Sequence, residues 1–132
     1  MLTENDKAYI AGLFDGEGSV SYYQRKIKRK NEKKAYNFWI IRCEISMTDK
    51  YVIEWLHKTL QMGSFHERKA HKSWLGKKNQ WRWCCGYRDA LQFAMLIWGH
   101  SQVKLHKLEQ IIDHYAPEEP SADIIYLKDK RK

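Results

Sequence analysis

The segment that most constrains the fold of this chain is the run YIAGLFDGEG, residues 9–18. It begins with helical character and ends with two acids, Asp15 and Glu17, each followed by a glycine. The C-terminus of a helix carries partial negative charge, so acids are disfavoured there and basic residues are expected. The glycines permit a sharp exit from the helix and a close approach of backbone to a ligand. The position of the two acids therefore indicates that they serve a cation.

The helix that leads into this run is predicted over residues 4–15. Thr3 is a suitable N-cap, Asp6 follows three residues later, and acids occupy the first turn. Ala8, Gly12 and Gly16 recur at intervals of four and so lie on one face of the helix. A stripe of small residues lets a second helix approach almost to backbone contact, so this face predicts a partner helix.

The run resembles the LAGLIDADG motif of homing endonucleases, residue for residue from Ile10 to Gly18. A motif match is a hypothesis, and the plainer interpretation is an ordinary helix followed by a glycine-rich turn. The two acids at the C-terminal end of the helix, where acids are disfavoured, favour the family over the ordinary helix and turn. The resemblance puts Glu17 at the position of the family's second, metal-binding acid, where Asp is more common.

Composition narrows the function classes in the same direction. The chain has 132 residues and a net charge of +8, which favours a polyanionic partner. Six Trp and eight Tyr exclude a disordered basic tail. Three cysteines fit neither a disulfide framework nor a zinc site. The longest apolar stretch, residues 93–98, is too short to span a bilayer. We therefore expect a soluble, intracellular protein, in the cytoplasm or in an organelle matrix if an organelle encodes it, with no membrane partner.

Hydrophobic periodicity predicts an α+β fold in one domain over residues 1–116, followed by a charged tail over 117–132. After Glu17, alternation predicts a strand, and a second strand has an apolar face of Trp39, Ile41, Cys43 and Ile45. A helix from Thr48-Asp49 to Gly63, strands over 64–70 and 79–86, and helices over 89–98 and 101–115 follow. The resulting order, αββαββα(α), is the core fold of the LAGLIDADG family. Its four-stranded antiparallel sheet has helices on one face and forms a DNA-binding saddle on the other.

The open face of the sheet is the predicted DNA-binding surface. A two-stranded ribbon fits the major groove and can place alternate side chains against base edges. Cations at the hairpin tip would contact phosphates, although a solvated charged loop is the plainer interpretation of that run. The predicted DNA contacts are Ser21, Tyr23, Arg25, Lys28, Arg29, Lys30, Lys33, Lys34, Tyr36, Phe38, Arg42, Glu44, Arg68, Lys69, Gln80 and Arg82.

The resemblance also implies a mechanism and an assembly. Glu17 and the carbonyl of Gly16 would ligate Mg²⁺, with Mn²⁺ as a substitute and Ca²⁺ as a non-productive ion, and no small-molecule cofactor is expected. Single-motif relatives form homodimers that cut both strands of a pseudo-palindromic site in double-stranded DNA. The implied catalytic residues are Glu17, Lys104 and Asp15, with Lys107 as the rival to Lys104, and the implied dimer interface contains Ala8, Ala11, Gly12 and Asp15.

One departure from the family keeps other functions open. Met47 ends the second strand, where relatives carry a polar residue that positions water; Ser46 or Asp49 could take that role, or the register could be off by one. A catalytically silent DNA-binding regulator or an intron RNA maturase on the same fold is therefore the alternative. A packaging protein without sequence preference is disfavoured by the uneven distribution of aromatic and cationic residues on the sheet.

Overall fold

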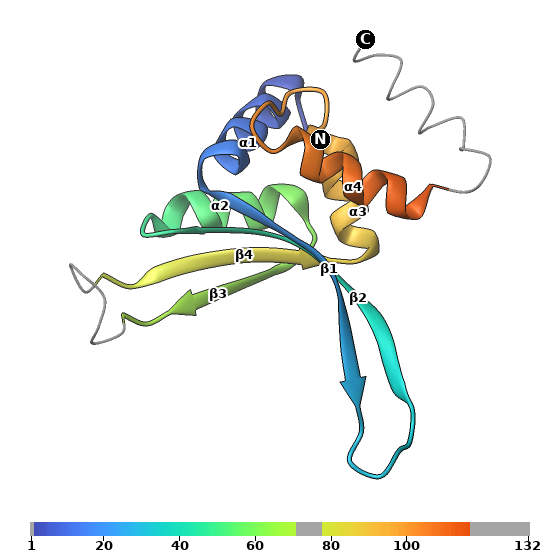
Figure 1. Ribbon diagram of the computed structural model, residues 1–132. Coiled ribbons are helices and arrows are strands. Elements are labelled where there is room, and N and C mark those ends of the chain that lie inside the picture. Colours follow the sequence, from blue (N-terminus) through green and yellow to red (C-terminus); the bar gives the residue numbers. More distant parts are fainter. Residues whose placement is uncertain (1, 71–77, 117–132) are drawn as a thin grey trace.

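The computed structural model of the chain describes residues 2–70 and 78–116. Within them the elements follow the order predicted from the sequence, as Figure 1 shows. They are α1 (Glu4–Glu17), β1 (Gly18–Lys28), β2 (Ala35–Met47), α2 (Lys50–Leu60), β3 (Ser64–Arg68), β4 (Gln80–Gly86), α3 (Arg88–Ile97) and α4 (Leu105–Tyr115).

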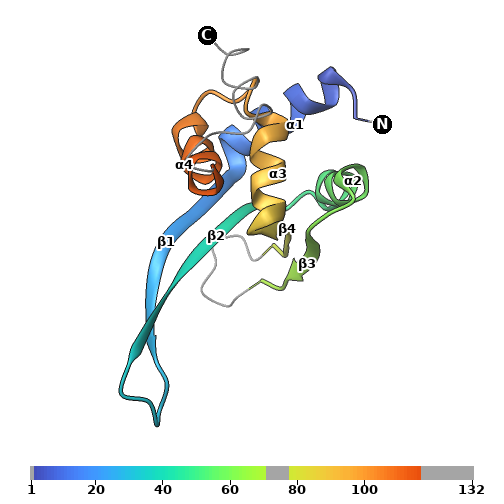
Figure 2. The ribbon, with the colours of Figure 1, turned by 90° about the vertical axis from the view of Figure 1, so that its right-hand side faces the viewer.

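The four strands form one antiparallel sheet in the order β1-β2-β4-β3. The helices gather on one side of this sheet, and the other side is left open (Figure 2). The far end of the β1–β2 hairpin projects well beyond the helices (Figures 1 and 2). The predicted fold class and the open sheet face are therefore confirmed.

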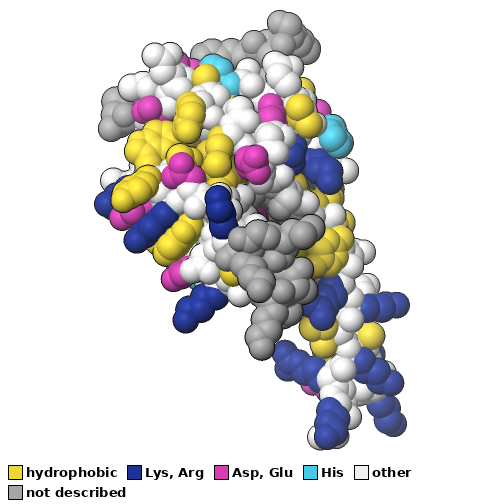
Figure 3. All heavy atoms as spheres, turned by 90° about the vertical axis from the view of Figure 1, so that its left-hand side faces the viewer, with side chains coloured by type: hydrophobic (Ala, Val, Ile, Leu, Met, Phe, Trp, Pro, Cys, Tyr) yellow, Lys and Arg dark blue, Asp and Glu magenta, His cyan; other side chains and the backbone are white. Residues whose placement is uncertain are grey.

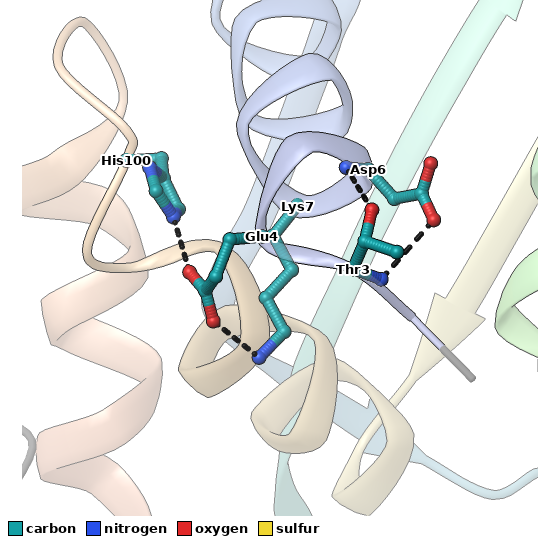
Figure 4. A network of polar contacts seen from close by, with 5 residues as sticks. All are labelled: Thr3, Glu4, Asp6, Lys7 and His100. Carbon is teal, nitrogen blue, oxygen red and sulfur yellow. Dashed lines mark hydrogen bonds and ion pairs between the residues drawn. The ribbon is translucent and has the colours of Figure 1, made fainter.

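Helix α1 begins as the sequence predicts and ends two residues later. The Thr3 hydroxyl accepts a hydrogen bond from the Asp6 amide at 3.0 Å, and the Asp6 carboxylate accepts one from the Thr3 amide at 3.1 Å (Figure 4). This reciprocal pair is a capping box. The helix continues through Glu17, and the Gly18 amide bonds to the Phe14 carbonyl. Both motif acids are consequently helical residues, and the chain passes directly from helix into strand.

The core lies between the helices and the inner face of the sheet. Ile41, Cys43 and Ile45 point into it from β2, as their alternation predicts. The Phe93 ring of α3 packs against Phe14 of α1 at 5.1 Å and against Trp83 of β4 at 4.9 Å between ring centroids. No helix among the described residues is long and apolar enough to span a bilayer.

Some boundaries differ from the predictions. Helix α4 begins at Leu105 rather than 101, because residues 101–104 form a loop that bonds to Asp15 of α1. Strand β3 ends at Arg68, so Lys69 lies beyond it. Most of the loop between the predicted strands over 64–70 and 79–86 falls on residues 71–77, and the predicted tail on 117–132, both outside the described residues.

Gly18 is needed at the helix-to-strand junction for steric reasons. A Cβ atom there would lie 2.3 Å from Cδ1 of Phe14 and 2.6 Å from its carbonyl oxygen. Because the buried ring and the helix backbone would both have to shift, we expect Gly18→Ala to lower the free energy of unfolding by about 1–3 kcal/mol. Urea denaturation measures this change. Gly99→Ala is the matched control, since nothing lies within 4 Å of its added carbon; equal losses in both variants would contradict the steric account.

Candidate active site and nucleic-acid interface

Strand register places the predicted DNA-reading side chains on the open face of the sheet. Residues paired directly across strands project to the same side. Rows such as Ser21 with Arg42 and Arg25 with Phe38 therefore share that face. The face comprises Ser19, Ser21, Tyr23, Arg25 and Ile27 of β1, Tyr36, Phe38, Ile40, Arg42, Glu44 and Ser46 of β2, Gln80, Arg82 and Cys84 of β4, and Ser64, His66 and Arg68 of β3.

Two polar members of this face, Ser64 and His66, were not predicted from the sequence. Ser64 and His66 lie opposite Cys84 and Arg82, so the pairing of β3 with β4 identifies them. The His66 Nε2 is 2.9 Å from the Ser64 hydroxyl, which is 3.2 Å from the Cys84 sulfur. Alternation within β3 alone could have indicated them, but it does not tell which face is open.

The middle of the open face carries a cluster of opposite charges. Glu44 is 3.8 Å from Arg42 Nε and 3.6 Å from Arg82 Nη1, and its carboxylate also accepts a hydrogen bond from Ser46 at 3.3 Å. Nε of Arg82 is buried and has no hydrogen-bond partner among the described residues. The Glu44 carboxylate thus holds two guanidinium groups at the open face of the sheet, and each guanidinium has five N–H donors in all.

The tip of the β1–β2 hairpin is strongly cationic. Its five predicted phosphate-binding residues are all exposed: Lys28, Arg29, Lys30, Lys33 and Lys34. Figure 3 shows Lys and Arg side chains spread over the end of this projection, with hydrophobic side chains among them. These charges lie far from the helices, where they can meet a polyanion without disturbing the core.

The end of α1 presents Glu17 to solvent. Its carboxylate is exposed and forms no hydrogen bond or ion pair with any described residue. Gly16 is exposed too, and carbonyls in the last turn of a helix lack intrahelical partners. A carboxylate and a carbonyl are the hard oxygen donors that suit Mg²⁺. The described residues contain no group of three or more His, Cys, Asp or Glu able to hold a metal, so further ligands would have to come from water, DNA or a second chain.

Asp15 is held differently from Glu17. Its carboxylate accepts hydrogen bonds from the Ser101 hydroxyl at 2.6 Å, the Gln102 amide at 2.7 Å and the Lys104 amide at 3.1 Å. Burial raises the pKa of Asp15, but these bonds and one from the Val103 amide outweigh it and hold the pKa below its ordinary 3.8. Asp15 therefore anchors the loop before α4 to the end of the motif helix.

The same anchor distinguishes the two candidate lysines. The Lys104 ammonium donates to the Asp15 carbonyl at 2.9 Å, next to the end of α1, and its side chain is partly buried. Lys107 is exposed and lies a turn further along α4.

At the other end of α1, His100 contacts Glu4 at 3.0 Å, and Glu4 also pairs with Lys7 (Figure 4). The His100 and Lys7 contacts lower the pKa of Glu4.

Met47 lies on the helix side of the sheet. It pairs with Trp81 and packs against the core, so it does not occupy the open face. Ser46 is the open-face residue at this end of β2. Asp49 accepts a hydrogen bond from the Val52 amide as the N-cap of α2. At this end of β2, Ser46 therefore takes the open-face position and Met47 the core position.

The small-residue stripe of α1 faces outward, with one correction. Ala8, Gly12 and Gly16 are exposed, and a Cβ at either glycine would meet nothing within 4 Å. Ala11 is fully buried in the core, so its assignment to a dimer interface was wrong: a side chain without exposed surface cannot touch a second chain. Asp15, which was also predicted to lie in the dimer interface, bonds to the loop over 101–104 and therefore faces that loop.

Comparison with known proteins gives structural similarity without sequence similarity. No family model matches the chain, and no curated protein matches it. A crystal structure of the homing endonuclease I-CvuI in complex with a DNA target superposes with a TM-score of 0.63 and 12% identity, over 98% of this chain and 71% of that one. The chain has the fold of the LAGLIDADG homing endonucleases.

Two further structures with this homing endonuclease fold are similar. The archaeal intron-encoded I-Vdi141I, complexed with DNA, gives a TM-score of 0.54 and 13% identity over 97% of this chain and 95% of that one. The LAGLIDADG homing endonuclease I-SmaMI, bound to cleaved DNA, gives a TM-score of 0.53 and 16% identity over 96% of this chain and 42% of that one. At these identities the backbone arrangement is what the proteins share, so the roles of individual residues have to be argued from this chain.

Because its pKa is lowered in the folded chain, Asp15 adds stability above its unfolded pKa, and this is lost as pH falls through the folded value. We expect the free energy of unfolding to decrease as the pH is lowered below about 4. The variant Asp15→Asn should make this decrease smaller and should also be less stable than the wild type at neutral pH. Denaturation at a series of pH values measures both effects. Glu54→Gln, which removes only a surface pair with Lys58, should leave the pH profile unchanged; a profile unaltered in Asp15→Asn would contradict the anchor.

Proposed function

We propose that the chain is a homodimeric, Mg²⁺-dependent endonuclease that cuts both strands of a long pseudo-palindromic site in double-stranded DNA. The observation that carries this proposal is the unpartnered, exposed carboxylate of Glu17 at the end of a helix that presents glycines outward. The domain responsible is taken as residues 1–116. Similarity of fold to homing endonucleases solved with DNA supports the choice of substrate.

Charge and shape support duplex DNA as the partner. The open face combines a central guanidinium–carboxylate cluster with an exposed cationic hairpin tip. In the proposed complex the tip lysines neutralise phosphates, which fixes position, and the ribbon enters the major groove. Arg42 and Arg82 then read base edges, with Glu44 keeping their guanidinium groups oriented.

A second copy is needed to complete the site. One chain offers one free motif carboxylate, whereas cleavage of both strands needs carboxylates at two scissile phosphates. Among the described residues nothing packs against the exposed glycines Gly12 and Gly16 of α1, since a Cβ at either would meet nothing within 4 Å. Two α1 helices packed about a two-fold axis would use these glycines and bring both Glu17 residues together.

Each residue near the helix end has a distinct proposed task. Mg²⁺, when bound, supplies Lewis-acid stabilisation of the phosphate and activation of water. Glu17 and the Gly16 carbonyl would hold it. The Lys104 ammonium, which Asp15 positions beside the helix end, offers positive charge to the scissile phosphate. Ser46 is the candidate for orienting water from the sheet.

Glu17→Gln tests the catalytic proposal. It preserves shape but removes the anion, so we expect cleavage to fall by more than about 100-fold, since even outer-shell partners of a metal site cost roughly 10–100-fold when lost. Binding without metal should be equal or tighter, because a carboxylate near phosphates is repelled. Cleavage of a duplex library with Mg²⁺, followed by sequencing of the cut ends, identifies the substrate; gel shift without divalent ions then measures affinity.

The comparison variant for this test is Asp15→Asn. It should reduce cleavage through loss of loop order and with a measurable loss of stability, whereas Glu17→Gln should not change stability. If the wild-type protein binds a defined duplex tightly but cuts it with no divalent ion, the silent regulator replaces the enzyme. If it prefers a structured RNA, the maturase does.

Gly12→Leu tests the assembly. A Leu side chain at this exposed position has open space in the single chain, so the fold should persist, but it would hold two α1 helices apart. We expect light scattering at micromolar concentration to change from about twice 15.9 kDa to about 15.9 kDa, with loss of double-strand cleavage. Tyr51→Leu adds an aliphatic side chain at an exposed position of α2 and should leave the mass at the dimer value. A monomeric wild-type protein that cuts both strands would refute the assembly.

A further inference from the structure

The β1–β2 hairpin exchanges its polar and apolar faces along its length. Near the helices, the inner face is apolar, with Val20 paired to Cys43 and Tyr22 to Ile41. Over the same stretch the open face is polar, with Ser19 paired to Glu44 and Ser21 to Arg42. This is the arrangement that a core on the inner side requires.

Beyond the helices the arrangement is reversed. On the inner side, Trp39 is the outermost residue of β2 that packs against the core, and from its row outward the exposed residues Gln24, Lys26 and Asn37 are polar. The open side carries apolar and aromatic ones in paired rows, in which Tyr23 pairs with Ile40, Arg25 with Phe38, and Ile27 with Tyr36. Tyr23, Ile27 and Tyr36 are 48%, 38% and 53% exposed. We name the five residues Tyr23, Ile27, Tyr36, Phe38 and Ile40 the distal apolar face.

No core explains the distal apolar face, because this part of the hairpin projects beyond the helices (Figures 1 and 2). A contiguous exposed apolar patch marks an interaction site. The charges around it define the partner: exposed cations occupy the tip just beyond the patch, and Arg25 lies within it. The partner must therefore present apolar groups in a strongly anionic setting.

The major groove of DNA has one apolar group of this kind, the C5-methyl of thymine, and apolar side chains recognise it by direct contact. We propose that the distal apolar face reads thymine methyl groups in the outer part of each half-site. This inference rests on the proposed function and specifies its substrate: a duplex whose outer segments carry thymines at the contacted positions, while Arg42 and Arg82 read the inner ones.

The spacing of residue rows along the hairpin fits this assignment of inner base pairs to the arginines and outer base pairs to the distal apolar face. Successive rows on one face lie about 6.8 Å apart, or roughly two base pairs of duplex at 3.4 Å each. From the row of Arg42 to that of Ile27 and Tyr36 is three rows, which gives about 20 Å and roughly six base pairs. The right-handed twist of a two-stranded ribbon lets it follow the groove over such a distance.

The test begins with selection from a random-sequence duplex library of about 40 base pairs in Ca²⁺, where binding occurs without turnover. Each thymine of the selected duplex is then replaced singly by uracil, which removes only the methyl group. We expect thymines at the outer end of each half-site to lose about fourfold in affinity per methyl, the equivalent of one buried CH₂. Inner positions should be insensitive to uracil.

Two variants on neighbouring residues connect the effect to the hairpin. Phe38→Ala should abolish the uracil penalty at the thymines it contacts, because the side chain that senses the methyl is gone. Asn37→Ala, on the opposite side of the same strand, should retain the full penalty. A merely structural role for Phe38 would weaken binding to the thymine and uracil duplexes equally and leave the penalty unchanged.

The outcomes separate this inference from the proposed function. If the selection enriches a duplex but uracil costs nothing, or the penalty persists in Phe38→Ala, the thymine-reading inference is overturned and the proposed function stands. If Phe38→Ala changes the mass of the free protein, the patch is an interface between copies, and the inference is likewise overturned. If no duplex is enriched, both proposals fail together.

Discussion

The carboxylate of Asp15 holds the helical layer in register with the motif helix. It gathers the Ser101 hydroxyl and the Gln102 and Lys104 amides within 3.1 Å, and these groups form the loop between α3 and α4. Without it, the Ser101 hydroxyl and the two amides would lose this acceptor, and the start of α4 would lose its position beside α1. The main-chain carbonyl of Asp15 also accepts a hydrogen bond from the Lys104 ammonium, so this one residue contributes both to the packing of the helices and to the position of a positive charge at the end of α1.

This anchor shows what the sequence could and could not reveal about the motif. An acid at a helix C-terminus is unfavourable unless something satisfies it. On that ground Asp15 and Glu17 were both expected to serve a cation. The donors that satisfy Asp15 lie 86 to 89 positions later in the chain, and no local pattern indicates them. Of the two acids, Glu17 is the one without a partner among the described residues, which is why the proposed metal site uses Glu17 rather than Asp15.

The strands were predictable to the extent that alternation determines facing. Trp39, Ile41, Cys43 and Ile45 form one periodic set, and this set fixed the inner face of β2 correctly. The same period assigns Met47 to the inner face, yet its place at the strand end suggested a position near the active site. Of the open-face residues of β3, Arg68 was predicted but Ser64 and His66 were not, since a five-residue edge strand shows no clear amphipathic pattern and its pairing with β4 decides which side is open.

The glycines at the motif differ in whether the fold of the single chain requires them. Each glycine in a helix interior costs about 1 kcal/mol relative to Ala. Gly12 and Gly16 have open space where a Cβ would lie, so steric exclusion within the chain does not require them. Gly18, by contrast, is required by Phe14. A chain selected only to fold alone would carry Ala at the first two positions and gain roughly 2 kcal/mol. This loss of stability at Gly12 and Gly16 is accounted for if a second α1 helix packs against the two glycines. In that case the stability of the motif helix and the assembly of the active site depend on the same interface.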